Sequence, residues 1–302
     1  MLVRDAASAK SGPRDDSLVD LMGSVSETDL RGWVKWFSVP RHFIAQPRAN
    51  REIAETIAGL FRDWGYEVSF QGDFYNVVAR PIGAKGRMAL VAAHFDSTAF
   101  TPGADDNASA VAAMLGCAKA VAAAKPARPV MFVSFNREED ELLGSSDFVG
   151  RLKRQQQSEI LCAHVLEMVG FASEEPDSQR TPAGLPIRLP STGNFLGLLA
   201  NRDSTRQMSH ALRQAKAYLP EFPTFGLHVL LGFEKYLPVL LRSDHAPFWQ
   251  QGIPSVMWTD TSEFRNPHYH RESDLPETLN YNFLRRVTQL LIAAVMTSPA
   301  AK

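Results

Sequence analysis

The chain has 302 residues, of which 45% are hydrophobic and 22% are charged, enough to build one large α/β domain with a sizeable core. The 32 Lys and Arg residues nearly balance the 33 Asp and Glu residues, and no long basic stretch occurs, which argues against a nucleic-acid partner. The apolar stretch at 290–296 is too short to span a bilayer, so we expect no membrane partner either.

The N-terminal sequence predicts a flexible leader over residues 1–24, followed by a single folded domain over residues 25–302. Residues 1–16 are largely polar and lack the apolar stretch of a secretory signal. We therefore expect a cytoplasmic protein, or a secreted one if the natural start lies upstream. Cys117 and Cys162 are the only cysteines, and both are expected to be buried free thiols because they lie in apolar segments.

Helical and strand-like patterns alternate along the rest of the chain. Helices are expected at 26–40, 50–64, 107–124, 145–154, 204–217 and 277–296, and strands at 67–70, 75–79, 88–93, 129–135, 160–166, 226–231 and 253–258. Residues 172–190 are rich in proline, serine and acidic residues and predict a long loop. The alternation predicts a single-domain α/β three-layer sandwich, with a mixed, mostly parallel central sheet covered by helices on both faces.

A histidine and an aspartate follow the buried strand predicted at 88–93. In open α/β sheets, sites form at the carboxyl ends of the strands. We expect His94 to bind a metal ion and Asp96 to orient its imidazole ring. Taken alone, this pair is weak evidence for a metal site, because a capped strand end explains it better.

Two pairs of acidic residues extend this pattern. Asp105 and Asp106 follow a turn at 102–103; a helix N-cap explains one acidic residue there better than two, and the carboxylate of Asp106 can bridge two cations. Glu138 and Glu139 follow the next buried strand. One of them would bind metal and the other would act as a general base, the alternative being solvated charges at a helix start.

Two further segments supply candidate ligands. Glu167 ends an apolar strand, where a carboxylate is costly unless it is paired or bound to metal. His268 and His270 share a face only in an extended segment, so we expect one ligand and favour His270. Asp244 and His245 are interpreted as a helix cap and a structural histidine, with a supporting role near the site as the alternative.

The motifs H-x-D-S, P-G-A-D-D-N-A-S, E-E followed by G-S, L-E-M, S-D-H and Y-H occur in this order. Together they resemble the M28 family of zinc peptidases, over about residues 51–287. The resemblance implies a zinc exopeptidase-like fold with a catalytic domain over 25–302, two zinc ions per chain, and a peptide or small amide as substrate. The oligomeric state stays open.

The resemblance also implies a role for each site residue. Five would bind the metal ions: His94 and Glu167 the first, Glu139 and His270 the second, and Asp106 both. Glu138 would be the general base, and Asp96 would support His94. Tyr269 either donates a hydrogen bond to the oxyanion formed during the reaction or simply packs. The family more often has Asp where this chain has Glu167, which leaves the geometry of this ligand open.

These features predict a zinc-dependent exopeptidase, with an aminopeptidase favoured because most soluble single-domain members of the family are aminopeptidases. A glutaminyl cyclase-like acyltransferase with one zinc ion is the first alternative, and the complete second ligand set argues against it. An M20-type amidohydrolase fits less well because residues 103–107 lack the lysine of that group's pattern. A non-catalytic binding protein on this scaffold would be expected to lose ligands. We expect the pocket walls to come from 172–190 and 222–241.

Overall fold

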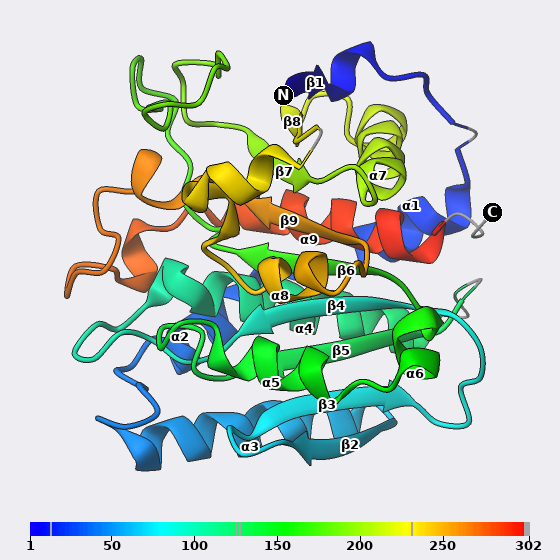
Figure 1. Ribbon diagram of the computed structural model, residues 1–302, viewed down its shortest axis with the longest axis vertical. Coiled ribbons are helices and arrows are strands. Elements are labelled where there is room, and N and C mark those ends of the chain that lie inside the picture. Colours follow the sequence, from blue (N-terminus) through cyan, green and yellow to red (C-terminus); the bar gives the residue numbers. More distant parts are fainter. Residues whose placement is uncertain (13, 125, 127, 231, 299–302) are drawn as a thin grey trace.

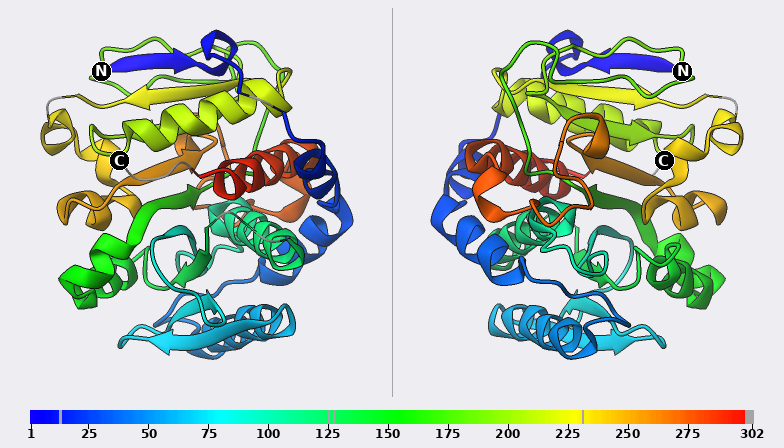
Figure 2. Two further views of the ribbon diagram at one scale, coloured as in Figure 1. Left: turned by 90° about the vertical axis from the view of Figure 1, so that its right-hand side faces the viewer. Right: turned by 90° about the vertical axis from the view of Figure 1, so that its left-hand side faces the viewer.

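The computed structural model describes residues 1–298 except 13, 125, 127 and 231. A nine-stranded sheet has the order β1-β8-β7-β9-β6-β4-β5-β3-β2. The strands are β1 (Leu2–Asp5), β2 (Tyr66–Gln71), β3 (Asn76–Pro81), β4 (Met88–His94), β5 (Val130–Phe135), β6 (Ile160–Glu167), β7 (Leu196–Ala200), β8 (Thr224–His228) and β9 (Ser255–Thr259). Strands β5, β4, β6 and β9 form a parallel centre, and antiparallel pairs occur on both sides of it. Figure 2 shows β1 and β2 at opposite edges.

Helices cover both faces of the sheet, which confirms the predicted three-layer α/β fold. One face carries α2 (Glu27–Phe37), α3 (Pro47–Asp63), α4 (Ala110–Ala123), α7 (Thr205–Tyr218) and α9 (Tyr281–Met296). The other carries α5 (Leu143–Arg151), α6 (Arg154–Glu159) and α8 (His245–Gln250). Figure 1 looks onto this second face, with α5 and α8 in front of the strands and α4 and α9 behind them.

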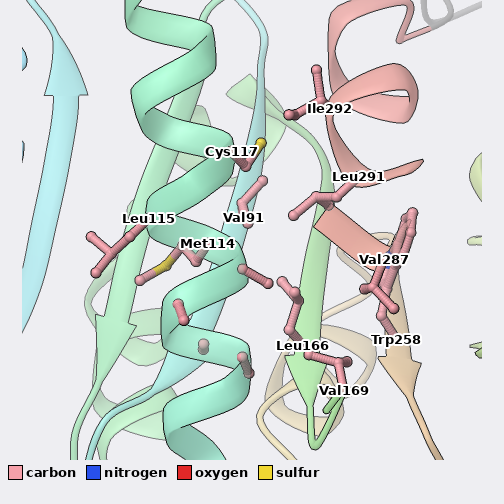
Figure 3. Close-up of a cluster of buried hydrophobic side chains, with 14 of the residues drawn as sticks. Val91, Met114, Leu115, Cys117, Leu166, Val169, Trp258, Val287, Leu291 and Ile292 are labelled. Carbon is pink, nitrogen blue, oxygen red and sulfur yellow. The ribbon is translucent and has the colours of Figure 1, made fainter. Parts of the chain in front are cut away.

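The main core lies between the sheet and α4 and α9. Strand β4 is buried along its whole length, as its unbroken apolar sequence predicts for a strand covered on both faces. Figure 3 shows Val91 of this strand beside Cys117 of α4 and Leu291 of α9. Cys117 and Cys162 are both buried free thiols, as expected. Among the described residues, no helix is long and apolar enough to cross a membrane.

The segment 1–24 does not form the expected flexible leader. Residues Leu2–Asp5 pair with β8 at the edge of the sheet, and residues Asp16–Gly23 form helix α1, which contacts α9. Helix α1 is short, but Leu18 and Met22 are one helical turn apart and both are buried, so it packs on one apolar side. The prediction missed this because few apolar residues are spread over a polar stretch.

Other differences are local. Strand β7 was not predicted, and the long helix expected at 107–124 begins at Ala110, after the helical turn Ala104–Ser109. The helix expected at 145–154 is α5, and the short helix α6 that follows it was not predicted. The strand expected at 226–231 is Thr224–His228, and Leu231 lies outside the described residues.

Candidate metal centre

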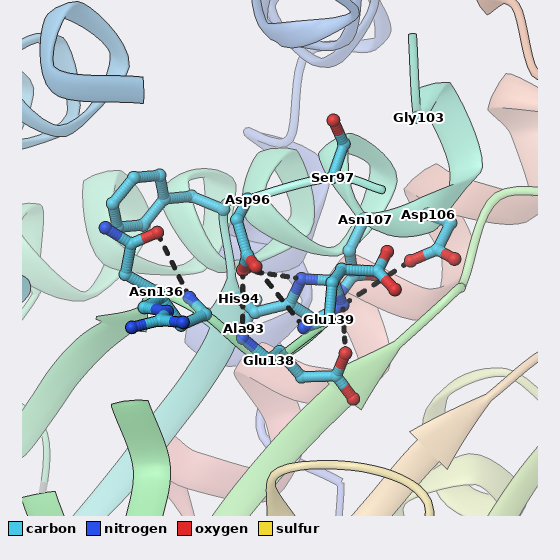
Figure 4. Close-up of polar contacts among 12 residues, drawn as sticks. Ala93, His94, Asp96, Ser97, Gly103, Asp106, Asn107, Asn136, Glu138 and Glu139 are labelled. Atoms are coloured by element: carbon cyan, nitrogen blue, oxygen red, sulfur yellow. Dashed lines mark hydrogen bonds and ion pairs between the residues drawn. The ribbon is translucent and has the colours of Figure 1, made fainter. Parts of the chain in front are cut away.

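Acidic and histidine side chains converge where the parallel strands end (Figure 4). His94 is the last residue of β4, and Glu167 is the last residue of β6. Asp106 lies in the turn before α4. The remaining members come from loops: Glu138 and Glu139 follow β5, and His270 follows β9. Because neighbouring parallel strands end at one edge of a sheet, residues far apart in the chain form one cluster.

The cluster divides into two groups of three, each with candidate ligand atoms within 4.8 Å of one another: His94, Glu138 and Glu167; Asp106, Glu139 and His270. Nε2 of His94 lies 3.6 Å from a Glu167 oxygen, and Nε2 of His270 lies 3.4 Å from a Glu139 oxygen. Asp106 faces both groups: Oδ1 is 3.4 Å from Nε2 of His94, and Oδ2 is 3.1 Å from Nε2 of His270. A carboxylate shared by two cations requires this orientation.

Several buried atoms of the cluster have no hydrogen-bond partner within the described part of the chain. They are both ring nitrogens of His94, Oδ1 of Asp106 and Oε1 of Glu139. Unpaired buried polar atoms are costly and uncommon. Since imidazole nitrogens and carboxylate oxygens are common zinc ligands, this donor set fits zinc ions.

Asp96 is fully buried and contacts three members of the cluster. Its Oδ1 accepts a hydrogen bond from the backbone N–H of Glu138 at 3.2 Å, and its Oδ2 accepts one from the backbone N–H of Glu139 at 3.3 Å. Oδ1 also lies 3.3 Å from Nδ1 of His94. The sequence predicted only the contact with the histidine, because backbone donors from a loop leave no sequence motif.

Asp274, which the sequence analysis missed, fixes the turn that carries Asp106. Its carboxylate accepts hydrogen bonds from the backbone N–H groups of Asp105 and Asp106, at 3.0 and 3.1 Å. Burial raises the pKa of Asp274 to about 7. Asp105 itself turns away from the cluster, and its carboxylate accepts from Asn266 Nδ2 at 2.6 Å and from the backbone N–H of Gly170 at 2.9 Å.

Arg41 was also missed, and it joins the end of β4 to the same turn. Its side chain is fully buried and donates to the carbonyl oxygens of Phe95, Pro102 and Gly103, at 2.6, 2.5 and 3.0 Å, and to that of Val39 at 3.1 Å. Burial lowers the pKa of Arg41 to about 10. A single arginine beside a proline carries no motif signal, so only the fold reveals this role.

Asn107 and Ser243 hold Glu167. Asn107 Nδ2 donates to the carbonyl of Leu166 at 3.1 Å, and its Oδ1 accepts from the backbone N–H of Met168 at 2.9 Å. Ser243 Oγ donates to Oε2 of Glu167 at 2.6 Å. The longer glutamate side chain is therefore fixed both through its main chain and through its carboxylate.

The other candidates lie beside the cluster rather than in it. His268 contacts Ser273 Oγ through Nδ1 at 2.9 Å and belongs to neither group. His245 is buried and contacts the carbonyl of Leu240 at 2.9 Å, consistent with a structural histidine. Asp244 does not cap α8 as expected, because its carboxylate is buried close to the cluster, where burial raises its pKa to about 7.

Tyr269 stacks on His270, with ring centroids 3.7 Å apart. Its hydroxyl oxygen accepts a hydrogen bond from Nη2 of Arg242 at 3.0 Å, and Arg242 also pairs with Glu263. Burial raises the pKa of Tyr269 above its ordinary value, so the hydroxyl keeps its proton. That proton is free to be donated to another acceptor, since the contact with Arg242 uses the oxygen only.

Burial and mutual repulsion make the carboxylates of the cluster hard to ionise together. Burial raises the pKa of Glu138 well above its ordinary value and, with the charge of Asp106, raises that of Glu139 to about 7. Burial works to lower the pKa of His270, but hydrogen bonds to Asp106 and Glu139 raise it to about 10. Bound cations would relieve the repulsion among these carboxylates.

Five members of the cluster line a cavity of about 480 Å³: Asp106, Glu138, Glu139, Glu167 and His270. Apolar residues from the expected segments contribute to its wall: Pro182, Leu185, Ile187 and Leu189 from the loop, and Phe225, Leu227, Val239, Leu240 and Leu241 from the later segment. Strands β7 and β9 and residue Val3 of β1 also line it, which the sequence analysis did not predict.

Comparisons with known proteins place this chain in a family. The sequence profile of "Peptidase family M28" matches residues 76–295. The "Uncharacterized protein YfbL" of Escherichia coli is 31% identical over 265 residues, which cover 81% of this chain and 79% of that protein. "Aminopeptidase YwaD" of Bacillus subtilis is 28% identical over 212 residues, covering 69% of this chain but only 40% of that protein.

Solved structures share the fold. The LapA aminopeptidase of Legionella pneumophila superposes with a TM-score of 0.72 at 17% identity, covering 95% of this chain and 77% of that one. An aminopeptidase from Aneurinibacillus sp. strain AM-1 gives a TM-score of 0.71 at 14% identity, covering 93% of this chain and 96% of that one. A glutaminyl cyclase of Porphyromonas gingivalis gives 0.66 at 19% identity, covering 89% and 97%. The fold is therefore common to hydrolases and cyclases, whereas the profile over residues 76–295 shows that this chain belongs to peptidase family M28.

Proposed function

We propose that this protein is a zinc-dependent aminopeptidase that binds two zinc ions. The observation that carries the proposal is the orientation of Asp106, whose two oxygens face His94 and His270 at 3.4 and 3.1 Å. The family match and the aminopeptidases among its relatives support peptide hydrolysis. Each group also supplies a further carboxylate ligand, from Glu167 and Glu139.

The residues divide between binding metal and moving protons. His94, Glu167 and Asp106 would hold one ion, and Asp106, Glu139 and His270 the other. When bound, zinc ions supply Lewis-acid activation of water and of the scissile carbonyl. Glu138 is not needed as a ligand in this assignment.

Glu138 is then free to serve as the general base. Its main chain is fixed by Asp96, its carboxylate lies 3.8 Å from Nε2 of His94, and the residue lines the cavity. Glu138 accepts a proton from the attacking water as the oxygen adds to the carbonyl carbon. It then passes this proton to the departing amine as the carbon–nitrogen bond breaks.

Tyr269 would assist by donating a hydrogen bond from its hydroxyl to the oxyanion that develops on the carbonyl oxygen. Its oxygen is occupied by Arg242, and burial keeps the hydroxyl protonated. We assign Tyr269 this role rather than simple packing because it lines the cavity beside His270.

A panel of substrates tests the proposal. Aminoacyl reporter amides, dipeptides and N-terminal glutaminyl peptides are incubated with the protein before and after removal of metal by a chelator. We expect release of N-terminal residues, loss of activity after chelation and recovery on adding zinc. Cyclisation of the glutaminyl peptides without hydrolysis would instead identify a cyclase, and cleavage from the C-terminal end would identify a carboxypeptidase.

A further inference from the structure

Among the described residues, no α-helix covers one half of the sheet on the face that carries the cavity. Helices α5 and α8 pack against the central strands through a cluster that includes Phe148, Phe248 and Leu90. Beyond β9, strands β7, β8 and β1 instead face the loop segment 182–189 and the short helical turn Pro238–Leu241. The cavity occupies the space beneath these segments.

The floor of the cavity follows from the alternation of side chains along the strands. Leu199 of β7, Leu227 of β8 and Met257 of β9 line it, while Trp258, the neighbour of Met257, belongs to the main core on the opposite face. Leu227 and Met257 are only partly buried although they are large and apolar. This surface is therefore apolar but incompletely covered.

The charges that line the cavity are confined to the metal cluster and its flanking loops. They are Asp106, Glu138, Glu139, Glu141, Glu167, Arg242, Glu263 and His270. The residues contributed by the loop 182–189 and by strands β1, β7 and β8 carry no charge. A charged substrate group placed among them would lose its hydration without gaining a partner, whereas an apolar group is favoured there.

We propose that this cavity binds a large apolar side chain on the residue that supplies the scissile carbonyl, and that Gly197 and Val3 set the size it accepts. The proposal rests on the function proposed above. The volume of about 480 Å³ lies within the range of pockets for drug-sized ligands, so groups larger than a phenylalanine side chain fit.

Gly197 has no side chain and therefore leaves space at the floor of the cavity. It lies in β7 opposite Phe225 of β8 and Thr259 of β9. The atoms nearest to a Cβ placed on Gly197 would be the Thr259 carbonyl oxygen at 3.2 Å and methyl groups of Thr259 and Thr261 at 3.6 and 3.8 Å. Because all these residues line the cavity, a larger side chain there would take up substrate space.

Val3 extends the floor to the edge of the sheet. It pairs with Leu227 and lines the cavity, whereas its neighbour Leu2 does not line it. The N-terminal strand thus contributes to the substrate site, and Leu2 offers a matched control on the same strand.

The test measures kcat/KM for alanyl, leucyl, phenylalanyl and biphenylalanyl reporter amides. We expect kcat/KM to be at least about ten-fold higher for the leucyl than for the alanyl substrate, and we expect the biphenylalanyl substrate still to be cleaved. Gly197→Val should lower kcat/KM for the two aromatic substrates by about ten-fold or more, relative to alanyl. Val3→Trp should reduce kcat/KM for the biphenylalanyl substrate selectively, whereas Leu2→Trp should leave it unchanged. A preference for alanyl, or selectivity unchanged in both cavity variants, would overturn the inference.

A binding measurement separates this inference from the proposed function. Alanine, phenylalanine and biphenylalanine hydroxamates are titrated calorimetrically into the zinc-treated wild-type and Gly197→Val proteins. Affinity that rises with side-chain size in the wild type but not in Gly197→Val supports the apolar site. If this result is found and no reporter amide is cleaved, the aminopeptidase proposal fails and the apolar site stands. Affinity independent of size contradicts the apolar site.

Discussion

The carboxylate of Asp96 accepts a hydrogen bond from the backbone N–H of Glu138, with 3.2 Å between Oδ1 and the nitrogen. The same carboxylate accepts from the backbone of Glu139 and lies 3.3 Å from Nδ1 of His94. One buried side chain thus fixes the proposed base and two proposed ligands relative to one another. The end of β4 and the loop after β5 are held together at the point where the chemistry is proposed.

Replacing Asp96 should therefore affect metal binding and turnover together. Asp96→Asn removes the negative charge and puts an N–H donor opposite one of the backbone donors. We expect zinc affinity or kcat/KM to fall by about 10- to 100-fold, as for other residues that support metal ligands. Competition with a chromogenic chelator measures the affinity. Unchanged affinity and turnover would show that these contacts do not position the site.

Glu138→Gln should separate metal binding from catalysis. The amide cannot accept the proton, so we expect kcat to fall by about 10²- to 10⁴-fold while bound zinc and the circular dichroism spectrum stay unchanged. Glu141→Gln is the control, because Glu141 lines the same cavity but belongs to neither ligand group. Near-normal turnover in Glu138→Gln would exclude this residue as the base.

Arg41→Met should destabilise the fold. The substitution leaves four carbonyl oxygens without the guanidinium that satisfies them. The contacts to Phe95 and Gly103 are buried and those to Val39 and Pro102 partly buried, and each buried group left unpaired costs about 1–3 kcal/mol. We expect the free energy of unfolding, measured in urea, to fall by more than about 3 kcal/mol. The exposed Arg48, replaced in the same way, should change it by less than about 0.5 kcal/mol. Equal effects of the two substitutions would rule out the proposed role of Arg41.

His164 predicts a loss of stability in acid. Burial lowers its pKa to about 3, and its Nδ1 accepts a hydrogen bond from Nε1 of Trp258 at 3.2 Å. The unfolded histidine takes up a proton near its ordinary pKa of about 6.5. The folded one does so only near pH 3, so its contribution is complete above about pH 6.5 and falls as the pH drops towards 3.

Each such histidine makes the free energy of unfolding fall by up to about 1.4 kcal/mol per pH unit in this window. Urea unfolding of the wild type and of His164→Gln at pH 7 and pH 5 measures the difference. We expect a smaller loss between these values in the variant, because it lacks this proton uptake. The same loss in both proteins would contradict the buried neutral state of His164.

The sequence predicted the parallel centre of the sheet well, because β4, β5 and β6 are continuous apolar runs. It also named the residues that the fold brings together, since each follows such a run or belongs to a motif with a set order. The edge strand β1 was missed because four residues pair with a strand more than 200 positions away. Such pairing depends on tertiary contacts and leaves no local pattern.

The residues that support the site were harder to predict than the proposed ligands. Arg41 and Asp274 act through backbone groups, and backbone donors and acceptors are the same at every position of a sequence. For the cavity, only the wall segments 172–190 and 222–241 were predicted. Its floor needed the order of β9, β7, β8 and β1, which their sequence order does not reveal.

The central claim is that the two groups around Asp106 bind two zinc ions and that peptide hydrolysis depends on them. The most direct test is a zinc titration of the chelator-treated protein, with bound zinc and leucyl-amide hydrolysis measured on the same samples. We predict that binding saturates close to two zinc ions per chain and that full activity returns only as zinc binds. Absence of bound zinc at saturating zinc concentrations, or full hydrolytic activity in the zinc-free protein, would contradict the account.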